Sequence, residues 1–202
     1  MIIGIKKIIK DENIKNLTYK EINELDSINS EKRKMEKSFS YGFIEDMLEE
    51  YEIRNYQIKK DQLGKPYLNH SEKYFNISHS NEYLACVVSD NDVGIDIEII
   101  SDKAKKIAKR FLHPDELQIH IVKHYNNEEL TTLWTIKEAY SKLIGLGLTK
   151  PFDTLKVLKN NGFSVVIDGD KKGFVKTFKH EEYIISVASY KLAEITNEIK
   201  IY

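Results

Sequence analysis

The order of periodic segments is the feature that most constrains the fold of this 202-residue chain, because helical patterns give way to strand patterns twice. In the first half we expect a strand at 2–10, helices at 18–28 and 31–50, and an apolar strand at 82–88. In the second half we expect helices at 101–112, from Pro114 onward and at 128–144, then strands at 153–159, 163–167, 173–179 and 182–190. The turn-forming residues 90–92 separate the strand at 82–88 from one at 93–100, which indicates a hairpin. The pattern predicts an α+β protein with two similar lobes, each with an antiparallel sheet and helices.

Composition narrows the class of protein. The formal net charge is −1, which argues against a general nucleic-acid binder. Cys86 is the only cysteine, so a disulfide within the chain is impossible. Lysines interrupt the first ten residues too early for a signal-peptide core, and no segment approaches the roughly 18 apolar residues of a membrane span. We therefore expect a cytoplasmic protein that binds neither nucleic acid nor a membrane.

Two short blocks, 94–98 and 134–142, gather charged side chains. The first reads Gly-Ile-Asp-Ile-Glu and puts Asp96 and Glu98 on one face of a strand. The second places Glu138 and Lys142 four residues apart, on one face of a helix. If the two segments pack together, three carboxylates and a lysine converge, which suits a Mg²⁺ site that handles phosphate. The alternatives are a solvated acidic strand face and an ordinary surface ion pair.

A polar cluster precedes the apolar strand at 82–88. It reads Phe-Asn-Ile-Ser-His-Ser over 75–80, and such donors at the entrance of a strand can bind phosphate. A turn in which the same side chains satisfy the local backbone is equally compatible with this composition. The charged run at 30–37 suits a solvated helix face, or a surface for a distal phosphate or an acidic partner.

Taken together, these blocks resemble the 4′-phosphopantetheinyl transferase superfamily, specifically its surfactin-synthetase-activating type. The family signature is Gly-Ile-Asp-x-Glu followed by Trp-x-x-Lys-Glu-Ala-x-x-Lys, and both parts are unbroken at 94–98 and 134–142. Gly-Lys-Pro at 64–66 and Asn-Ile-Ser-His-Ser at 76–80 match two further family blocks in the right order. The resemblance covers residues 64–148.

The resemblance implies an enzyme, a holo-[acyl-carrier-protein] synthase or 4′-phosphopantetheinyl transferase. It would transfer the 4′-phosphopantetheine group of coenzyme A to a serine of an apo acyl or peptidyl carrier protein and release 3′,5′-ADP, with Mg²⁺ as cofactor. Carriers of fatty acid and of nonribosomal peptide biosynthesis both fit. The resemblance also implies a monomer in a pseudo-dimeric arrangement, and we expect lobes at 1–97 and 98–202 with the active site between them.

The motifs assign roles to individual residues. The metal ligands would be Asp96, Glu98 and Glu138, and Lys142 would neutralise the pyrophosphate of coenzyme A. Glu116 resembles a family acidic position near the active site, so that the expected catalytic set is Glu138, Lys142 and Glu116, with either glutamate as the base. The expected contacts with coenzyme A, besides Lys142, are Lys65 and Pro66 at the adenine, Ser78 and His79 at the 3′-phosphate or ribose, and Lys32 near the 3′-phosphate.

One segment departs from the family, which usually has an arginine ahead of a Leu-Leu-Gly segment in the N-terminal helix. Residues 39–44 read Phe-Ser-Tyr-Gly-Phe-Ile instead, so that Arg33, Lys34 or Lys37 would have to compensate. Carrier proteins are acidic around the modified serine, and we expect the basic residues of the helix at 101–112 to steer them. A Mg²⁺-dependent phosphohydrolase and a non-catalytic scaffold that binds coenzyme A or a carrier are the rival interpretations.

Overall fold

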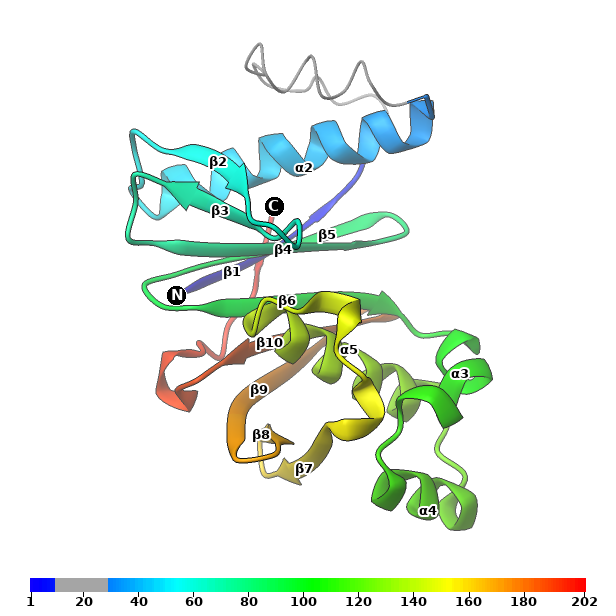
Figure 1. Ribbon diagram of the computed structural model, residues 1–202. Helices are drawn as coiled ribbons and strands as arrows, with labels where there is room; N and C mark the ends of the chain where they lie inside the picture. Colours follow the sequence, from blue (N-terminus) through cyan, green and yellow to red (C-terminus); the bar gives the residue numbers. More distant parts are fainter. Residues whose placement is uncertain (10–28) are drawn as a thin grey trace.

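Two β-sheets lie face to face between outer helices in the computed structural model, which describes residues 1–9 and 29–202 (Figure 1). The strand order in the N-terminal sheet is β11-β1-β5-β4, with bounds Lys200–Ile201, Ile2–Lys7, Tyr83–Ser89 and Tyr74–Ser80. The order in the C-terminal sheet is β6-β10-β9-β8-β7, with bounds Val93–Ile99, Tyr183–Ser189, Lys171–His180, Phe163–Asp168 and Lys156–Asn160. A separate two-stranded sheet consists of β2 (Gln57–Lys60) and β3 (Pro66–Asn69).

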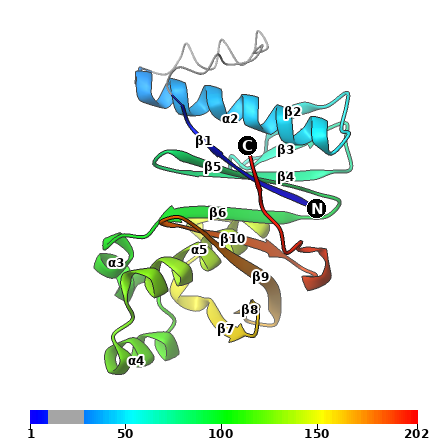
Figure 2. The same ribbon diagram turned by 180° about the vertical axis from the view of Figure 1, so that it is seen from behind.

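The helices cover the outer faces of the two sheets (Figure 2). The N-terminal sheet carries α2 (Glu31–Glu50), and the C-terminal sheet carries α5 (Asn127–Leu143). Two shorter helices, α3 (Lys103–Phe111) and α4 (Pro114–Lys123), precede α5, and single turns of 3₁₀ helix lie at Gly147–Thr149, Phe152–Thr154 and Leu192–Glu194. The helix expected at 18–28 lies outside the described residues.

The same order of elements occurs twice, which confirms the predicted α+β class with two similar lobes. β1, α2, the β2–β3 pair and the β4–β5 pair are followed by β6, α5, the β7–β8 pair and the β9–β10 pair. In each half the first strand pairs antiparallel with the last, β1 with β5 and β6 with β10. The division between residues 97 and 98 falls inside β6 and stays a prediction.

The core is built on strands whose two faces are both apolar. In β5, Leu84, Cys86 and Val88 pack against the cluster under α2. Ala85 and Val87 point to the opposite face and join the cluster between the two sheets. Such a strand is a continuous apolar run, which is why the sequence identifies it readily.

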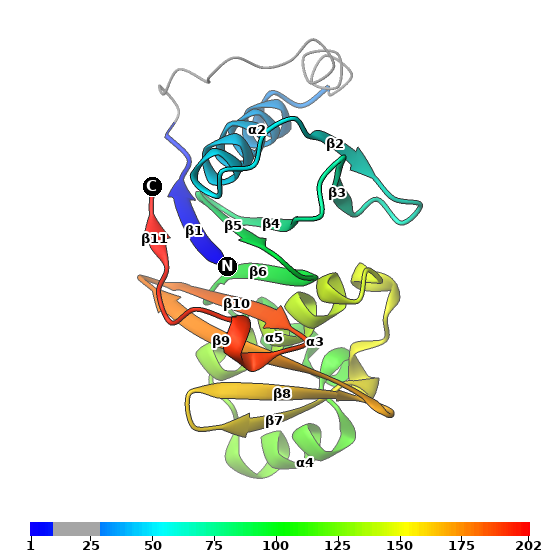
Figure 3. The same cartoon turned by 90° about the vertical axis from the view of Figure 1, so that its left-hand side faces the viewer.

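The hairpin expected at 82–100 is wrong. Both edges of β5 are occupied, by β1 and β4, while β6 pairs with β10 in the other sheet. The turn after Ser89 therefore carries the chain from one sheet to the other, and the apolar faces of β5 and β6 meet between the sheets. The last strand crosses back, because β11 lies parallel to β1 at the edge of the N-terminal sheet (Figure 3).

Most other boundaries agree with the sequence. The helix expected at 31–50 and those beginning near 101, 114 and 128 are confirmed, as are the four C-terminal strands within a few residues. The last long helix ends as expected, since Gly145 just beyond it has φ +76°. The sequence does not predict β2, β3 or β11. It also does not predict β4, because the residues of this strand resemble a polar cluster that precedes a strand.

Candidate active site

The edges of the two sheets meet along β4 and β6, and polar side chains of β4 join them. Asn76 Oδ1 accepts a hydrogen bond from the backbone N of Ile95 at 2.9 Å. Ser80 Oγ accepts from the backbone N of Ile99 at 3.2 Å. These side chains therefore satisfy the open edge of β6 in place of another strand, and they fix where β6 lies against β4.

Gly94 sets the position of α5 over β6. A Cβ atom at this residue would lie 2.1 Å from the carbonyl O of Ala139 and 2.5 Å from the backbone N of Leu143. Only glycine permits this approach of backbone to backbone. The approach places the last two turns of α5, which carry Glu138 and Lys142, directly against the strand that carries Asp96.

The predicted charged residues converge at this crossing. Lys142 Nζ donates to Asp96 Oδ1 at 2.7 Å and lies 3.7 Å from Glu138 Oε2. Ser78 Oγ on β4 accepts from Lys142 Nζ and donates to Asp96 Oδ1, both at 2.8 Å. Glu98 Oε2 accepts from Ser80 Oγ at 3.0 Å. The structure thus brings together residues from β4, β6 and α5.

The cluster carries more negative charge than Lys142 balances. Burial raises the pKa of Glu138 to about 8, and the neighbouring Asp96 adds to this effect. Burial, and after it the charge of Asp96, also raises the pKa of Glu98. Burial disfavours the ammonium form of Lys142, but Asp96 and Glu138 outweigh it and raise the pKa of Lys142. Three carboxylates next to a single ammonium leave an excess of negative charge that a further cation would offset.

The donor set fits Mg²⁺. Asp96 Oδ2 is buried without a hydrogen-bond partner, and a hard cation would satisfy this oxygen. Asp96, Glu98 and Glu138 are the residues that would hold the ion. They do not form a ready-made cluster of three ligands within 1–9 and 29–202. The Lys142 ammonium contacts Asp96 and Glu138 instead, so that metal binding would require this side chain to move.

Lys65 and Pro66 line two adjoining cavities beside the C-terminal end of α5. The larger has a volume of about 510 Å³ and is also lined by Asp92 and Tyr190. The smaller, of about 220 Å³, is also lined by Lys142 and therefore leads to the carboxylates. Lys65 Nζ donates to the carbonyl O of Leu143 at 3.3 Å, and burial lowers the pKa of Lys65. The two cavities share Lys65, Pro66 and Gly145 in their walls, and Lys142 connects the smaller one with the charged cluster.

Two predicted contacts lie away from the cluster. His79 alternates with Ser78 and Ser80 along β4, so that its side chain points to the opposite face, where Nε2 lies 3.9 Å from Glu36 Oε2. Lys32 lies in the first turn of α2, and its side chain is outside the described part of the structure.

Glu116 is not brought to the cluster either. Its buried carboxylate pairs with Lys137 Nζ at 2.6 Å, on a face of α5 different from that of Glu138. The sequence does not predict this pair, because Glu116 and Lys137 lie in different helices. Trp134, in contrast, lies near the cluster, because it lines a cavity of about 160 Å³ together with Glu98.

The fold and the charged crossing of α5 with β6 define a two-lobed α+β protein with a centre of three carboxylates and one lysine. A family model described as the 4'-phosphopantetheinyl transferase superfamily matches residues 92–192, which is half of the chain and includes this centre. The chain belongs to this superfamily.

Individual relatives agree with the surfactin-synthetase-activating type predicted from the motifs. The chain is 38% identical over 130 residues to "4'-phosphopantetheinyl transferase gsp" of Aneurinibacillus migulanus, covering 63% of this chain and 54% of that protein. It is 31% identical over 141 residues to "4'-phosphopantetheinyl transferase Sfp" of Bacillus subtilis (strain 168), covering 62% of each. The chain thus spans little more than half the length of these relatives.

Among solved structures, the Thermotoga maritima holo-[acyl-carrier-protein] synthase (AcpS) matches with a TM-score of 0.42 and 23% identity. The match covers 48% of this chain and 61% of that one. Separately, none of the helices in the described residues is long and apolar enough to cross a membrane.

Proposed function

We propose that the protein transfers the 4′-phosphopantetheine group from coenzyme A to a serine of an apo acyl or peptidyl carrier protein and releases 3′,5′-ADP in a Mg²⁺-dependent reaction. The observation that carries the proposal is the convergence of Asp96, Glu98, Glu138 and Lys142 where α5 crosses β6. A cavity lined by Lys65 and Lys142 lies beside this crossing. The names of the relatives support the same activity.

The chemistry requires alignment and charge balance more than covalent participation of the protein. The serine Oγ forms a bond to the phosphorus that carries pantetheine. The bond from this phosphorus to the bridging oxygen breaks, and that oxygen leaves on 3′,5′-ADP. Bound by Asp96, Glu98 and Glu138, Mg²⁺ would offset the negative charge of the pyrophosphate. Lys142 and Ser78 provide hydrogen-bond donors at the same place.

Glu138 is the better of the two predicted bases. Its carboxylate lies at the crossing of α5 and β6, 3.7 Å from Lys142 Nζ, where it could accept the serine proton directly or through a water. Glu116 is not available to accept a proton in this way, because both of its carboxylate oxygens already accept hydrogen bonds within the lobe, from Lys137 and two backbone N–H groups.

The carrier would approach over α3. This helix has no acidic residue and presents five basic side chains to solvent. They are Lys103, Lys105, Lys106, Lys109 and Arg110. Lys103 lines the same small cavity as Glu98, so that the basic surface reaches the edge of the site. An acidic carrier surface is complementary to this helix. A cytoplasmic monomer is part of the proposal, and light scattering in solution tests the monomer.

Intact-protein mass spectrometry of an apo carrier protein tests the proposal. The carrier is incubated with this protein, coenzyme A and Mg²⁺, next to an EDTA control and a carrier whose serine is replaced by alanine. The proposal predicts a gain of one phosphopantetheine that both controls abolish. Release of 3′,5′-ADP without any gain would instead indicate a phosphohydrolase, and binding of coenzyme A without either product would indicate a scaffold.

A further inference from the structure

The buried ion pair of Glu116 and Lys137 lies outside the charged cluster, and the charged groups of both side chains are fully hydrogen-bonded. Lys137 is fully buried, and its ammonium donates to Glu116 Oε2 at 2.6 Å, to the carbonyl O of Phe111 at 2.7 Å and to that of Phe152 at 3.2 Å. An ammonium group has three hydrogens, so that this one is saturated.

Both carboxylate oxygens of Glu116 are engaged as well. Besides Lys137, its Oε2 accepts from the backbone N of His113 at 3.0 Å, and its Oε1 accepts from the backbone N of Val157 at 2.8 Å. The pair therefore joins four segments to α5: the end of α3, the start of α4, the turn at Phe152–Thr154 and β7. Both groups are thus committed to buried partners within the lobe rather than to a substrate.

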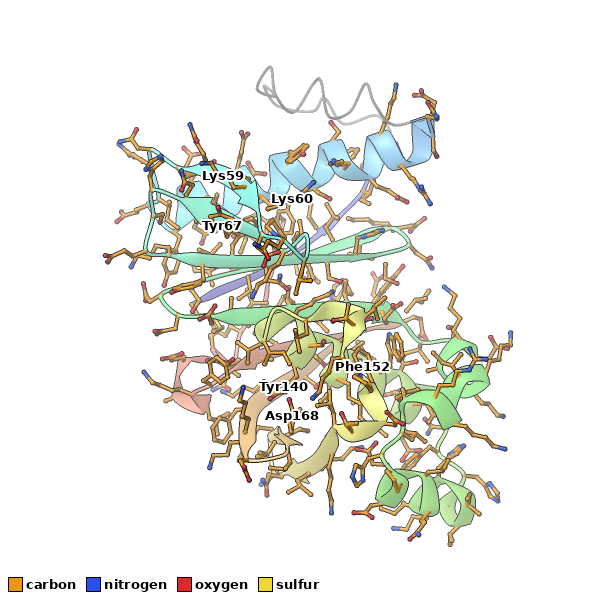
Figure 4. All side chains as sticks on the ribbon, viewed as in Figure 1. Lys59, Lys60, Tyr67, Tyr140, Phe152 and Asp168 are labelled. Atoms are coloured by element: carbon orange, nitrogen blue, oxygen red, sulfur yellow. The ribbon has the colours of Figure 1, made fainter. Side chains whose placement is uncertain are left out.

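The two carbonyl groups held by Lys137 belong to the two residues whose rings enclose Trp134. The Phe111 ring lies edge-on to the indole at a centroid distance of 5.3 Å, and the Phe152 ring lies at 5.2 Å. Phe152 lies in the C-terminal lobe, near α5, in Figure 4. Trp134 in turn lines both the cavity next to Glu98 and a second one, of about 290 Å³, that is also lined by Arg110 and Leu148.

We propose that Glu116 and Lys137 are a positioning pair that holds Phe111 and Phe152 against Trp134 and thereby fixes the wall between the carboxylate site and the carrier-facing surface. In this role Glu116 does not accept the serine proton. The inference rests on the proposed transferase function, and it names the residues that shape the side of the site next to the basic helix α3.

Three variants separate positioning from proton transfer: Glu116→Gln, Lys137→Met and the double variant. Each single substitution leaves one buried charge without its partner, so that both should lower kcat/KM about 10- to 100-fold. The double variant removes both charges, and the amide that replaces the Glu116 carboxylate can still bond the N of Val157 and one carbonyl. Its kcat should therefore recover to within about tenfold of the wild type, while the KM for the carrier stays raised. Loss of a general base, about 10²- to 10⁴-fold, is not restored by a second substitution.

Trp134 provides a readout that needs no turnover, because it is the only tryptophan of the chain. Its emission should shift to longer wavelength, and acrylamide quenching should increase, in both single variants. The emission and quenching measurements remain informative even if the wild type has no transferase activity. An inactive wild type would refute the transferase function but not the positioning role of the pair. The exposed pair Glu128–Lys179 offers a matched control, since Glu128→Gln with Lys179→Met should leave activity and emission unchanged.

A pH profile gives the deciding result. If Glu116 and Lys137 only hold Phe111 and Phe152 in place, the group that accepts the serine proton is still present in the double variant. The acidic limb of its kcat/KM profile should then persist. A double variant that is unfolded or as inactive as Glu116→Gln overturns the proposal. So does a Glu116→Gln protein that keeps native Trp134 emission but loses the acidic limb, because Glu116 would then be the base.

Discussion

Replacing Gly94 by alanine tests whether the crossing of α5 over β6 creates the site. The added Cβ would lie 2.1 Å from the carbonyl O of Ala139, about 1.3 Å closer than the 3.4 Å at which ordinary contact begins. Both of the nearest atoms belong to the helix backbone, so that the strain cannot be relieved by turning a side chain. The helix must move by about 1 Å at the turns that carry Glu138 and Lys142, and a displacement of about 1 Å can cost about 10²-fold in rate.

The same overpacking should destabilise the fold by about 1–3 kcal/mol. At about 2–4 °C per kcal/mol for a chain of this size, the melting temperature should fall by roughly 2–12 °C. Carrier modification is followed by mass spectrometry and unfolding by circular dichroism. Gly42→Ala is the matched control, because nothing lies within 4 Å of its added Cβ on α2. A Gly94→Ala protein with wild-type rate and melting temperature would refute the reasoning.

Three further predictions concern the charged groups. Asp96→Asn should slow carrier modification by at least about 10²-fold. Its melting temperature, measured by circular dichroism, should stay within a few degrees of the wild type, because Lys142 retains Glu138 as a partner. A rate above a tenth of the wild-type rate contradicts this role of Asp96. Mg²⁺ at 100 times its Kd should stabilise the protein by about 2.7 kcal/mol in differential scanning fluorimetry, and EDTA should reverse the effect; an equal rise in Asp96→Asn would locate the ion elsewhere. Raising salt from about 50 to 300 mM should increase the KM for the carrier, and Lys105→Gln with Lys109→Gln should flatten this dependence; a KM independent of salt contradicts steering by α3.

The part of the site that follows from local periodicity was predictable. Strand alternation puts Asp96 and Glu98 on one face, and helical spacing pairs Glu138 with Lys142; the structure brings all four together. Gly94, the first residue of the same motif, is the point at which the backbone of α5 approaches β6. Each of these features depends on only a few residues that lie close together in the sequence, so that local spacing is enough to predict it.

The parts that depend on distant partners were not predictable. Asn76, Ser78 and Ser80 resemble turn residues, but they form a strand whose polar face bonds β6 and its carboxylates. Had this strand been recognised, alternation alone would have directed His79 to the opposite face. Glu116 resembled a site carboxylate because spacing along the chain does not show that Lys137 reaches it from α5.

A crystal structure of the protein with coenzyme A and Mg²⁺ would show whether the crossing of α5 and β6 binds both. We expect a metal ion bound to Asp96 Oδ2 with Glu98 and Glu138 as further ligands. We also expect the pyrophosphate of coenzyme A at Lys142 and its nucleotide in the cavities lined by Lys65. A metal ion or a pyrophosphate bound away from the crossing of α5 and β6, with Lys142 still paired to Asp96, would contradict this expectation.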